Sequence, residues 1–150
     1  MAEQPIYDGR FGAELSPRAQ GKVFAASEVI QYKSGTTIFR EGDHSKYLFI
    51  IKSGQVFLEI TVPPKGWRSL LTVGPGELFS WSALVAPRVE NASARASVDT
   101  EALRVDGETL MKLCAEDSAL GLEVYRTLAK VISSRLIATR LQFLDVFQVG

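Results

Sequence analysis

The fold is decided by residues 74–96, GPGELFSWSALVAPRVENASARA. The stretch opens on a Gly-Pro-Gly turn, which ends an apolar run from Trp67 to Val73. From Ala92 onward, small apolar residues alternate with polar ones, and this period of two predicts a strand with one apolar face. The stretch therefore marks an interruption between two groups of predicted strands.

Short apolar runs rich in β-branched and aromatic residues flank this interruption, and glycine or proline separates them. They cover residues 29–32, 37–40, 47–51, 56–60 and 67–73 before it, and residues 102–105 after it. Strands separated by tight turns at this rhythm predict an antiparallel roll or barrel. We therefore expect a mainly β fold with flanking helices: an antiparallel β-roll of the jelly-roll (double-stranded β-helix) kind, followed by a long C-terminal helix.

Two short helices are predicted, one before the roll and one after it. Ser16-Pro17 supplies an N-cap and a proline at the first helical position for a helix that reaches about residue 26. Asp106 is expected to cap a second helix that runs through Ala115. At 150 residues the chain is expected to form a single domain: a helical segment over 1–28, the roll over 29–105 and helices over 106–150.

The last predicted helix, from about residue 118 to residue 147, is long for a chain of this size. Roughly 28 residues span about 42 Å, whereas a globule of about 150 residues is about 38 Å across. Its distal apolar residues would lie in water unless another surface covers them. The helix could fold back on its own roll, but we favour a homodimer in which two such helices pair. The cations Arg126, Lys130, Arg135 and Arg140 are expected on its polar face, and the expected interface residues are Leu128, Val131, Leu136, Leu141 and Leu144.

Residue counts argue against several classes of function. The 17 basic residues balance the 17 acidic ones, whereas a domain that grips nucleic acid usually has a basic excess. His44 is the only histidine and Cys114 the only cysteine, which argues against a metal site, a Ser-His-Asp triad and an internal disulfide. There is no cationic leader and no apolar run of membrane length. We therefore expect a cytoplasmic protein that is not an enzyme and has no membrane association.

Several segments, taken in order, resemble the cyclic nucleotide-binding domain family of the catabolite-activator type. Residues 34–43, SGTTIFREGD, look like the strand and turn that begin that family's roll, and residues 47–56 look like its next strand pair. Residues 74–93 look like its ligand-binding cassette, and residues 128–147 like its dimerisation helix. The resemblance covers nearly the whole chain and implies the same roll that the strand pattern predicts.

The resemblance also implies a ligand site in the cassette. In that family a one-turn helix offers backbone N–H groups to a phosphate, an acidic residue accepts from the ribose, and an arginine pairs with the phosphate. Here the acidic position falls on Trp81, and the arginine position falls on Glu90 or the residue beside it. Trp81 is expected either to stack on a ligand or to plug the pocket. The candidate ligand-binding residues are Gly76, Glu77, Phe79, Ser80, Trp81, Ser82, Ala83, Arg88, Ala92 and Ser93, with Arg88 as the candidate cation.

Together these patterns predict a non-enzymatic ligand-sensing or regulatory module, in which binding favours one arrangement of a helix pair. The resemblance implies a cyclic nucleotide (cyclic AMP or cyclic GMP) or another small phosphate-bearing anion as the ligand. The alternative is a degenerate dimerisation module whose own side chains close the pocket, so that it binds no nucleotide. The family's transcription factors continue into a helix-turn-helix, and this chain's end at Gly150 and zero net charge argue against direct DNA binding.

Overall fold

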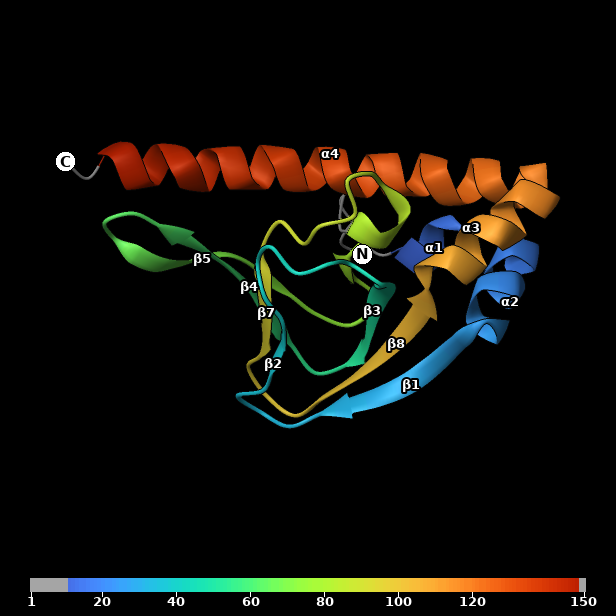
Figure 1. Ribbon diagram of the computed structural model, residues 1–150, viewed down its shortest axis with the longest axis horizontal. Helices are drawn as coiled ribbons and strands as arrows, with labels where there is room; N and C mark the ends of the chain where they lie inside the picture. Colours follow the sequence, from blue (N-terminus) through green and yellow to red (C-terminus); the bar gives the residue numbers. More distant parts are fainter. Residues whose placement is uncertain (1–10, 149–150) are drawn as a thin grey trace, which may run out of the picture.

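Two four-stranded antiparallel sheets form the centre of the molecule (Figure 1). The computed structural model describes the backbone of residues 11–148 and the side chains of residues 11–138 and 140. The first sheet has the order β1-β8-β3-β6, with β1 Ser27–Tyr32, β3 Tyr47–Ser53, β6 Leu78–Ser80 and β8 Thr100–Asp106. The second has the order β2-β7-β4-β5, with β2 Thr37–Phe39, β4 Val56–Val62, β5 Gly66–Val73 and β7 Ser93–Ala96. The predicted antiparallel roll with flanking helices is confirmed.

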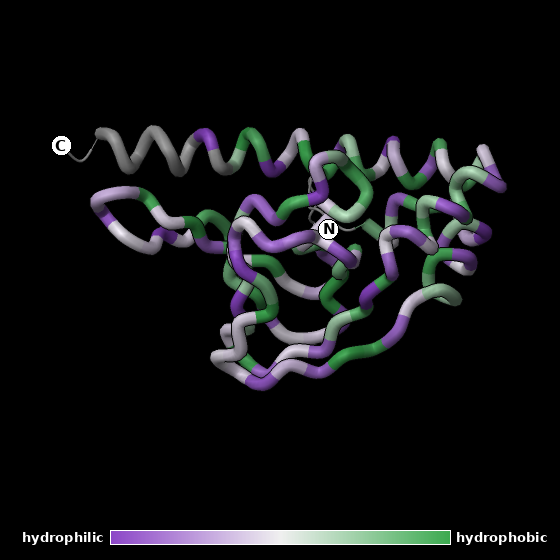
Figure 2. Tube along the Cα trace, viewed as in Figure 1, coloured by the Kyte–Doolittle hydropathy of each residue, from purple (hydrophilic) through white to green (hydrophobic). Residues whose placement is uncertain are grey.

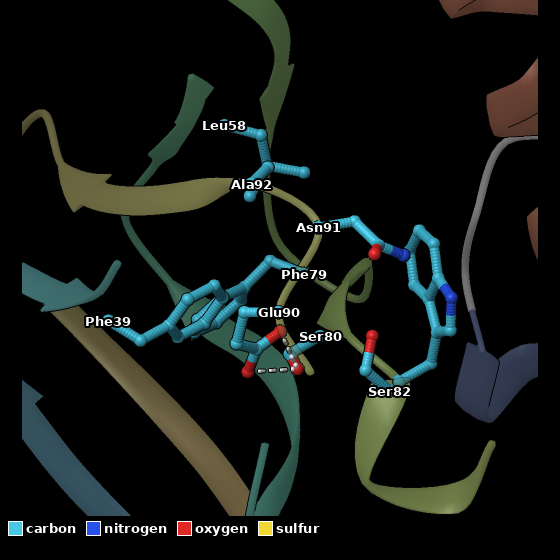
Figure 3. Close-up of a pocket in the computed structure, with 9 residues that line it drawn as sticks. Phe39, Leu58, Phe79, Ser80, Ser82, Glu90, Asn91 and Ala92 are labelled. Atoms are coloured by element: carbon cyan, nitrogen blue, oxygen red, sulfur yellow. Dashed lines mark hydrogen bonds between the residues drawn. The ribbon is translucent and has the colours of Figure 1, made fainter. Parts of the chain in front are cut away.

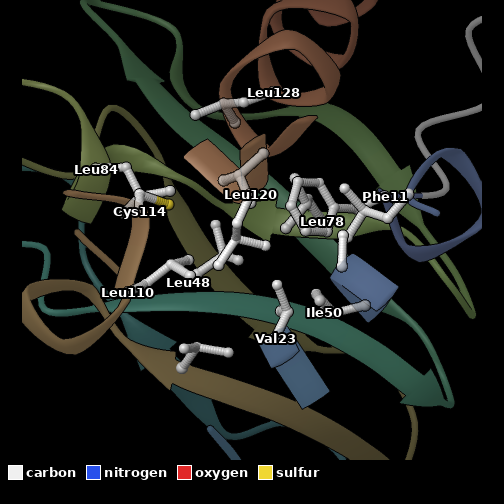
Figure 4. Close-up of a cluster of buried hydrophobic side chains, with 14 of the residues drawn as sticks. Phe11, Val23, Leu48, Ile50, Leu78, Leu84, Leu110, Cys114, Leu120 and Leu128 are labelled. Atoms are coloured by element: carbon white, nitrogen blue, oxygen red, sulfur yellow. The ribbon is translucent and has the colours of Figure 1, made fainter. Parts of the chain in front are cut away.

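Strand β3 is buried on both faces, and it therefore connects two hydrophobic clusters. Because side chains alternate along a strand, Phe49 and Ile51 join the cluster that includes Val56 on β4, whereas Leu48 and Ile50 join the cluster formed with the helices. Figure 4 shows this second cluster, in which side chains from the helices pack over the first sheet. The first sheet thus has one face toward the second sheet and the other toward the helices.

Four α-helices flank the roll in the described part of the chain, and two of them start at the capping residues predicted from the sequence. They are α1 Phe11–Glu14, α2 Pro17–Ala25, α3 Gly107–Glu116 and α4 Ser118–Gln148. The Ser16 hydroxyl accepts from the Ala19 amide at 3.3 Å, and the Asp106 carboxylate accepts from the Thr109 amide at 3.0 Å. The one-turn helix α1 was not predicted as a separate element.

The junction between α3 and α4 is fixed to α2 by charged contacts. The Asp117 carboxylate accepts from the Lys22 ammonium at 2.6 Å, from the Arg18 guanidinium and from the Leu120 amide. These contacts hold the pKa of Asp117 well below its usual value, the hydrogen bond from Lys22 having the largest effect. Glu123 on α4 accepts from the Ser16 amide at 2.8 Å, so α2 and the start of α4 are joined at two places.

Helix α4 has 31 residues and runs across the roll, with its C-terminal half above the β4–β5 hairpin (Figure 1). Hydrophobic and hydrophilic residues alternate along its described part (Figure 2). Leu128 and Val131 are only 1% and 4% exposed and belong to the chain's own core, so their prediction as interface residues is wrong. Leu136 is exposed, and Leu141 and Leu144 lie outside the residues whose side chains are described.

None of the helices in the described part of the chain has both the length and the apolar character needed to cross a bilayer.

Candidate ligand site

The predicted cassette begins with a tight turn that is bonded into the first sheet. Gly76 has φ +84°, a conformation that a residue with a side chain rarely adopts. Its amide donates to the Ile51 carbonyl at 2.8 Å, and the Ile51 amide donates to the Glu77 carbonyl at 3.0 Å. The Gly76 amide therefore serves the backbone of the roll, and the structure does not bring it to a ligand cavity.

A single helical turn, η1 Ser82–Leu84, follows β6, as the resemblance implied. Ala83 and Leu84 are buried, and Ala83 packs against the start of α3. A Cβ atom added to Gly107 would lie 2.7 Å from the Ala83 Cβ, which is closer than such atoms approach. The glycine at the start of α3 therefore allows η1 to sit directly against that helix, and Ala83 has a packing role.

A buried carboxylate lies at the position where the resemblance placed an arginine. Glu90 is 5% exposed, and both of its carboxylate oxygens lie 2.9 Å from the Ser80 hydroxyl, which donates to them (Figure 3). The Ser45 hydroxyl, 3.4 Å from that of Ser80, also bonds to this carboxylate. Burial raises the pKa of Glu90 to about 7, and the nearby charge of Asp43 adds to the rise, whereas the two hydroxyls oppose it.

The cavity beside this carboxylate is small. Its volume is about 40 Å³, enough for a few water molecules. Figure 3 shows the Glu90 carboxylate on one side of the site and the Asn91 and Ser82 side chains on the other. Its lining residues are Phe39, Leu58, Phe79, Ser80, Trp81, Ser82, Glu90, Asn91 and Ala92.

A second and larger cavity of about 520 Å³ lies between the roll and α4. Its wall consists of mainly apolar side chains from β4, β5 and α4, together with Trp81 from the cassette. Leu58, Trp81, Asn91 and Ala92 line both cavities, so the two spaces adjoin. The remaining lining residues of the larger cavity are Ile60, Leu70, Leu71, Ile132, Arg135, Leu136 and Arg140.

Among the described side chains of α4, Arg135 and Tyr125 form polar contacts with the cassette. Arg135 is buried, whereas the sequence predicted it on the polar face of the helix. Its guanidinium donates to the Leu78 carbonyl and lies 3.7 Å from the Glu77 carboxylate. The guanidinium also lies 5.5 Å from the centre of the Trp81 ring. Tyr125 donates its hydroxyl to the Leu84 carbonyl of η1 at 3.3 Å. Helix α4 thus contacts the cassette both at β6 and at η1.

Arg88, the predicted cation, does not line either of these cavities. Arg88 itself has φ +59°, in the left-handed region, and its guanidinium lies 3.3 Å from the Met111 sulfur on α3. There it lines a separate cavity that includes His44 and Lys46. The prediction that Arg88 lies in the cassette site is therefore wrong, because the chain between η1 and β7 turns its side chain toward α3.

The other predicted residues fall into two groups. Phe79, Ser80, Trp81, Ser82 and Ala92 are brought together around the cavities. Gly76, Glu77, Ala83 and Ser93 are not, since Glu77 pairs with Arg135 and the Ser93 hydroxyl accepts from the Glu41 amide at 2.9 Å. The prediction also omitted Glu90 and the α4 residues Ile132 and Arg135; alignment with the cassette pattern pointed to Glu90, but no local signal marked the other two.

The two-sheet roll, a cassette interrupting it and a long helix packed beside that cassette define a regulatory ligand-binding domain. A sequence profile of the cyclic nucleotide-binding domain matches residues 29–117, and the chain belongs to this family.

Individual relatives agree with this assignment. The chain is 38% identical to the cyclic AMP receptor protein of Thermus thermophilus over 113 residues, covering 75% of this chain and 50% of that protein. The crystal structure of the Thermus thermophilus catabolite activator protein aligns with a TM-score of 0.76 at 29% identity, covering 93% and 63% of the two chains. A cyclic nucleotide-binding domain from Methylobacillus flagellatus shares the fold with a TM-score of 0.82 at 20% identity, covering 92% and 82%. The chain spans about half the length of the curated relatives it matches.

Proposed function

We propose that this protein is a non-enzymatic regulatory module that senses a small molecule between its cassette and α4 and acts as a homodimer in the cytoplasm. The observation that carries the proposal is the composition of the larger cavity's wall. Trp81 and Asn91 line it from the cassette, and Ile132 and Arg135 line it from α4. A ligand in this cavity would contact both elements at once, so its binding energy would depend on how α4 sits against the roll.

The contacts between cassette and helix provide the coupling. Tyr125 bonds to η1, and Arg135 bonds to β6 and packs on Trp81. A ligand that displaces the Trp81 indole would therefore disturb Arg135 directly. In this proposal Trp81 stacks on the ligand, because its ring already forms part of both cavity walls.

The proposed dimer surface is a row of exposed residues on α4. Leu122, Tyr125, Ala129, Ser133 and Leu136 follow one another at steps of three and four, which places them along one side of the helix. Leu122 is 57% exposed and Tyr125 is 40% exposed. The small residues in the middle of the row permit two helices to approach to about 8–10 Å. Tyr125 belongs to this row and also contacts η1, so it links the proposed dimer surface to the cassette.

Sedimentation equilibrium tests the dimer. The wild-type protein should sediment as a dimer, and Leu122→Lys should sediment as a monomer, because the new charge would lie in the helix pair. Val29→Lys is the matched control: Val29 is also an exposed apolar residue but lies on β1, so this variant should remain a dimer. A monomeric wild-type protein at tens of micromolar would contradict the proposal.

Fluorescence tests the coupling without any ligand. The sequence contains two tryptophans, so Trp67→Phe leaves Trp81 as the only indole. In this background, adding Leu122→Lys should change the emission maximum of Trp81 and its quenching by acrylamide, whereas adding Val29→Lys should not. If the Trp81 signal is identical in the dimer and the monomer, the cavity does not report on the helix pair.

Calorimetry with cyclic AMP and cyclic GMP at millimolar concentration provides the first ligand test, because both are implied by the family. A degenerate dimerisation module is the second candidate function, and the buried Glu90 carboxylate in a cavity of about 40 Å³ favours it. That candidate predicts a dimer whose melting temperature is unchanged by every member of a small-molecule library. A reproducible rise in melting temperature with any member would exclude it.

A further inference from the structure

Glu90 retains the capacity to accept hydrogen bonds from a ligand. An ionised carboxylate offers about four acceptor sites, and two hydroxyl groups, of Ser80 and Ser45, donate to it. Among the described residues, Glu90 has the only buried carboxylate, and this carboxylate lines the smaller cavity. Glu90 therefore presents acceptor oxygens to whatever enters that space, which the polar side chains of Ser82 and Asn91 line from the opposite side.

The charge of this carboxylate is not balanced within the described part of the chain. No lysine, arginine or histidine there forms an ion pair with Glu90, and the neighbouring charge that affects it, Asp43, has the same sign. Arg88 faces Met111, and Arg135 lines the larger cavity but not the smaller one. A buried anion without a counter-charge is unfavourable, and a cation placed beside it removes that cost.

The arrangement of the two cavities separates polar from apolar recognition. The smaller cavity ends at Glu90 and holds a group the size of a few water molecules. The larger one is mostly apolar, and its volume of about 520 Å³ is typical of small-molecule sites. Trp81 belongs to both walls, and the face of an indole attracts cations.

We infer that the ligand of this site is an amine: a molecule with a protonated, hydrogen-bond-donating head at Glu90 and an aromatic or aliphatic body in the cavity beside α4. This inference rests on the proposed function and specifies its ligand class. The ammonium donates to the carboxylate and pairs with its charge, and the body covers Leu58, Ile60 and Leu71. A phosphate in the same place would bring a third negative charge beside Glu90 and Asp43, so the site selects against it.

Three indole probes with similar bodies and different heads test the inference by calorimetry at pH 8. Tryptamine carries an ammonium, tryptophol a neutral hydroxyl and indole-3-propionate a carboxylate. Tryptamine should bind at least tenfold more tightly than tryptophol, and indole-3-propionate should bind most weakly. In Glu90→Gln the preference for tryptamine over tryptophol should fall to within about twofold, with tryptophol itself little affected. Glu116→Gln, which removes an exposed carboxylate from α3, should keep the full preference.

The outcomes separate this inference from the proposed function. Equal binding of all three probes to the wild-type protein would overturn the inference that the ligand carries an amine at Glu90. It would still support a small-molecule site in the cavity beside α4. Binding of cyclic AMP or cyclic GMP without binding of tryptamine would also overturn the inference while supporting a sensing function. Failure of tryptamine to bind at millimolar concentration, with the dimer and the Trp81 signal as proposed, overturns the inference alone.

Discussion

Replacing Glu90 by glutamine should make the protein more stable at neutral and alkaline pH, although it removes a side chain with two hydrogen-bond partners. The carboxyl group is buried, and its pKa rises from an ordinary value of 4.5 to about 7, chiefly because burial disfavours the charge. Below pH 4.5 the group is protonated in the folded and the unfolded chain. Glutamine resembles that protonated state in shape and has no charge.

The size of the effect follows from the interval between the two pKa values. Between pH 4.5 and pH 7 the folded state holds a proton that the unfolded state has released, so the free energy of unfolding decreases as the pH rises. At about 1.4 kcal/mol per pH unit, the loss is about 3 kcal/mol and is complete above pH 7. Glu90→Gln does not titrate, so its advantage over the wild type should grow from about zero near pH 4.5 to about 3 kcal/mol at pH 8.

Urea unfolding followed by circular dichroism, at one fixed protein concentration and at several values between pH 4.5 and pH 8, measures this difference. Glu116→Gln controls for the change in net charge, because its carboxylate is exposed on α3. A difference between Glu90→Gln and the wild type that stays constant across the range would refute the reasoning. So would a variant that is less stable than the wild type at pH 8, since it would mean that the hydroxyl contacts outweigh the cost of burying the charge.

Four further substitutions test the packing of the site and of the helices. Gly107→Ala should lower the free energy of unfolding in urea by about 1–3 kcal/mol, because the added Cβ would collide with Ala83 of η1. Gly21→Ala in α2 is the matched control: a Cβ added there meets no atom within 4 Å, so this variant should raise the free energy of unfolding by about 0.5–1 kcal/mol. Leu128→Ala should cost about 2–5 kcal/mol and leave the dimer intact at low temperature in a sedimentation run, since the side chain is in the core. Asp117→Asn should lower the urea midpoint at pH 7. The gap to the wild type should narrow progressively below pH 3.8, because the wild-type carboxylate loses its stabilising contacts as it is protonated through its lowered pKa.

The local elements of this chain were predictable because short-range chemistry specifies them. Ser16 followed by Pro17 starts α2, and Asp106 starts α3, since a side-chain oxygen must satisfy the first amides of a helix. The strands of the roll could also be predicted, because short runs of alternating apolar residues bounded by glycine are typical of β-strands. Alternation was less reliable around β7. Ser93, expected on the polar face, is buried and accepts from the Glu41 amide, and Val98 is exposed because β7 ends at Ala96.

The candidate site was predicted less well, because its residues come from segments distant in sequence. Ser80, Trp81 and Ala92 were identified within the cassette and do line the cavities. Arg88 was misplaced, since its direction depends on a turn whose backbone conformation is set by contacts with the loop before β3. Arg135 was expected on a polar surface, and only the packing of α4 against β6 shows that it is buried.

By itself the sequence determined the two sets of strands, the capped helices, the family and the unusual residues of the cassette, all of which depend on neighbours along the chain. Tertiary structure alone decided which face of α4 is covered, so that Leu128 and Val131 are core residues while Leu122 and Tyr125 are exposed. It also decided that Glu90 is surrounded by Ser45 and Ser80, 45 and 10 positions away in sequence, and is therefore a buried carboxyl group with an altered pKa. The physical reason is that burial and electrostatic environment are sums over neighbours in space, and the folding of the chain selects those neighbours.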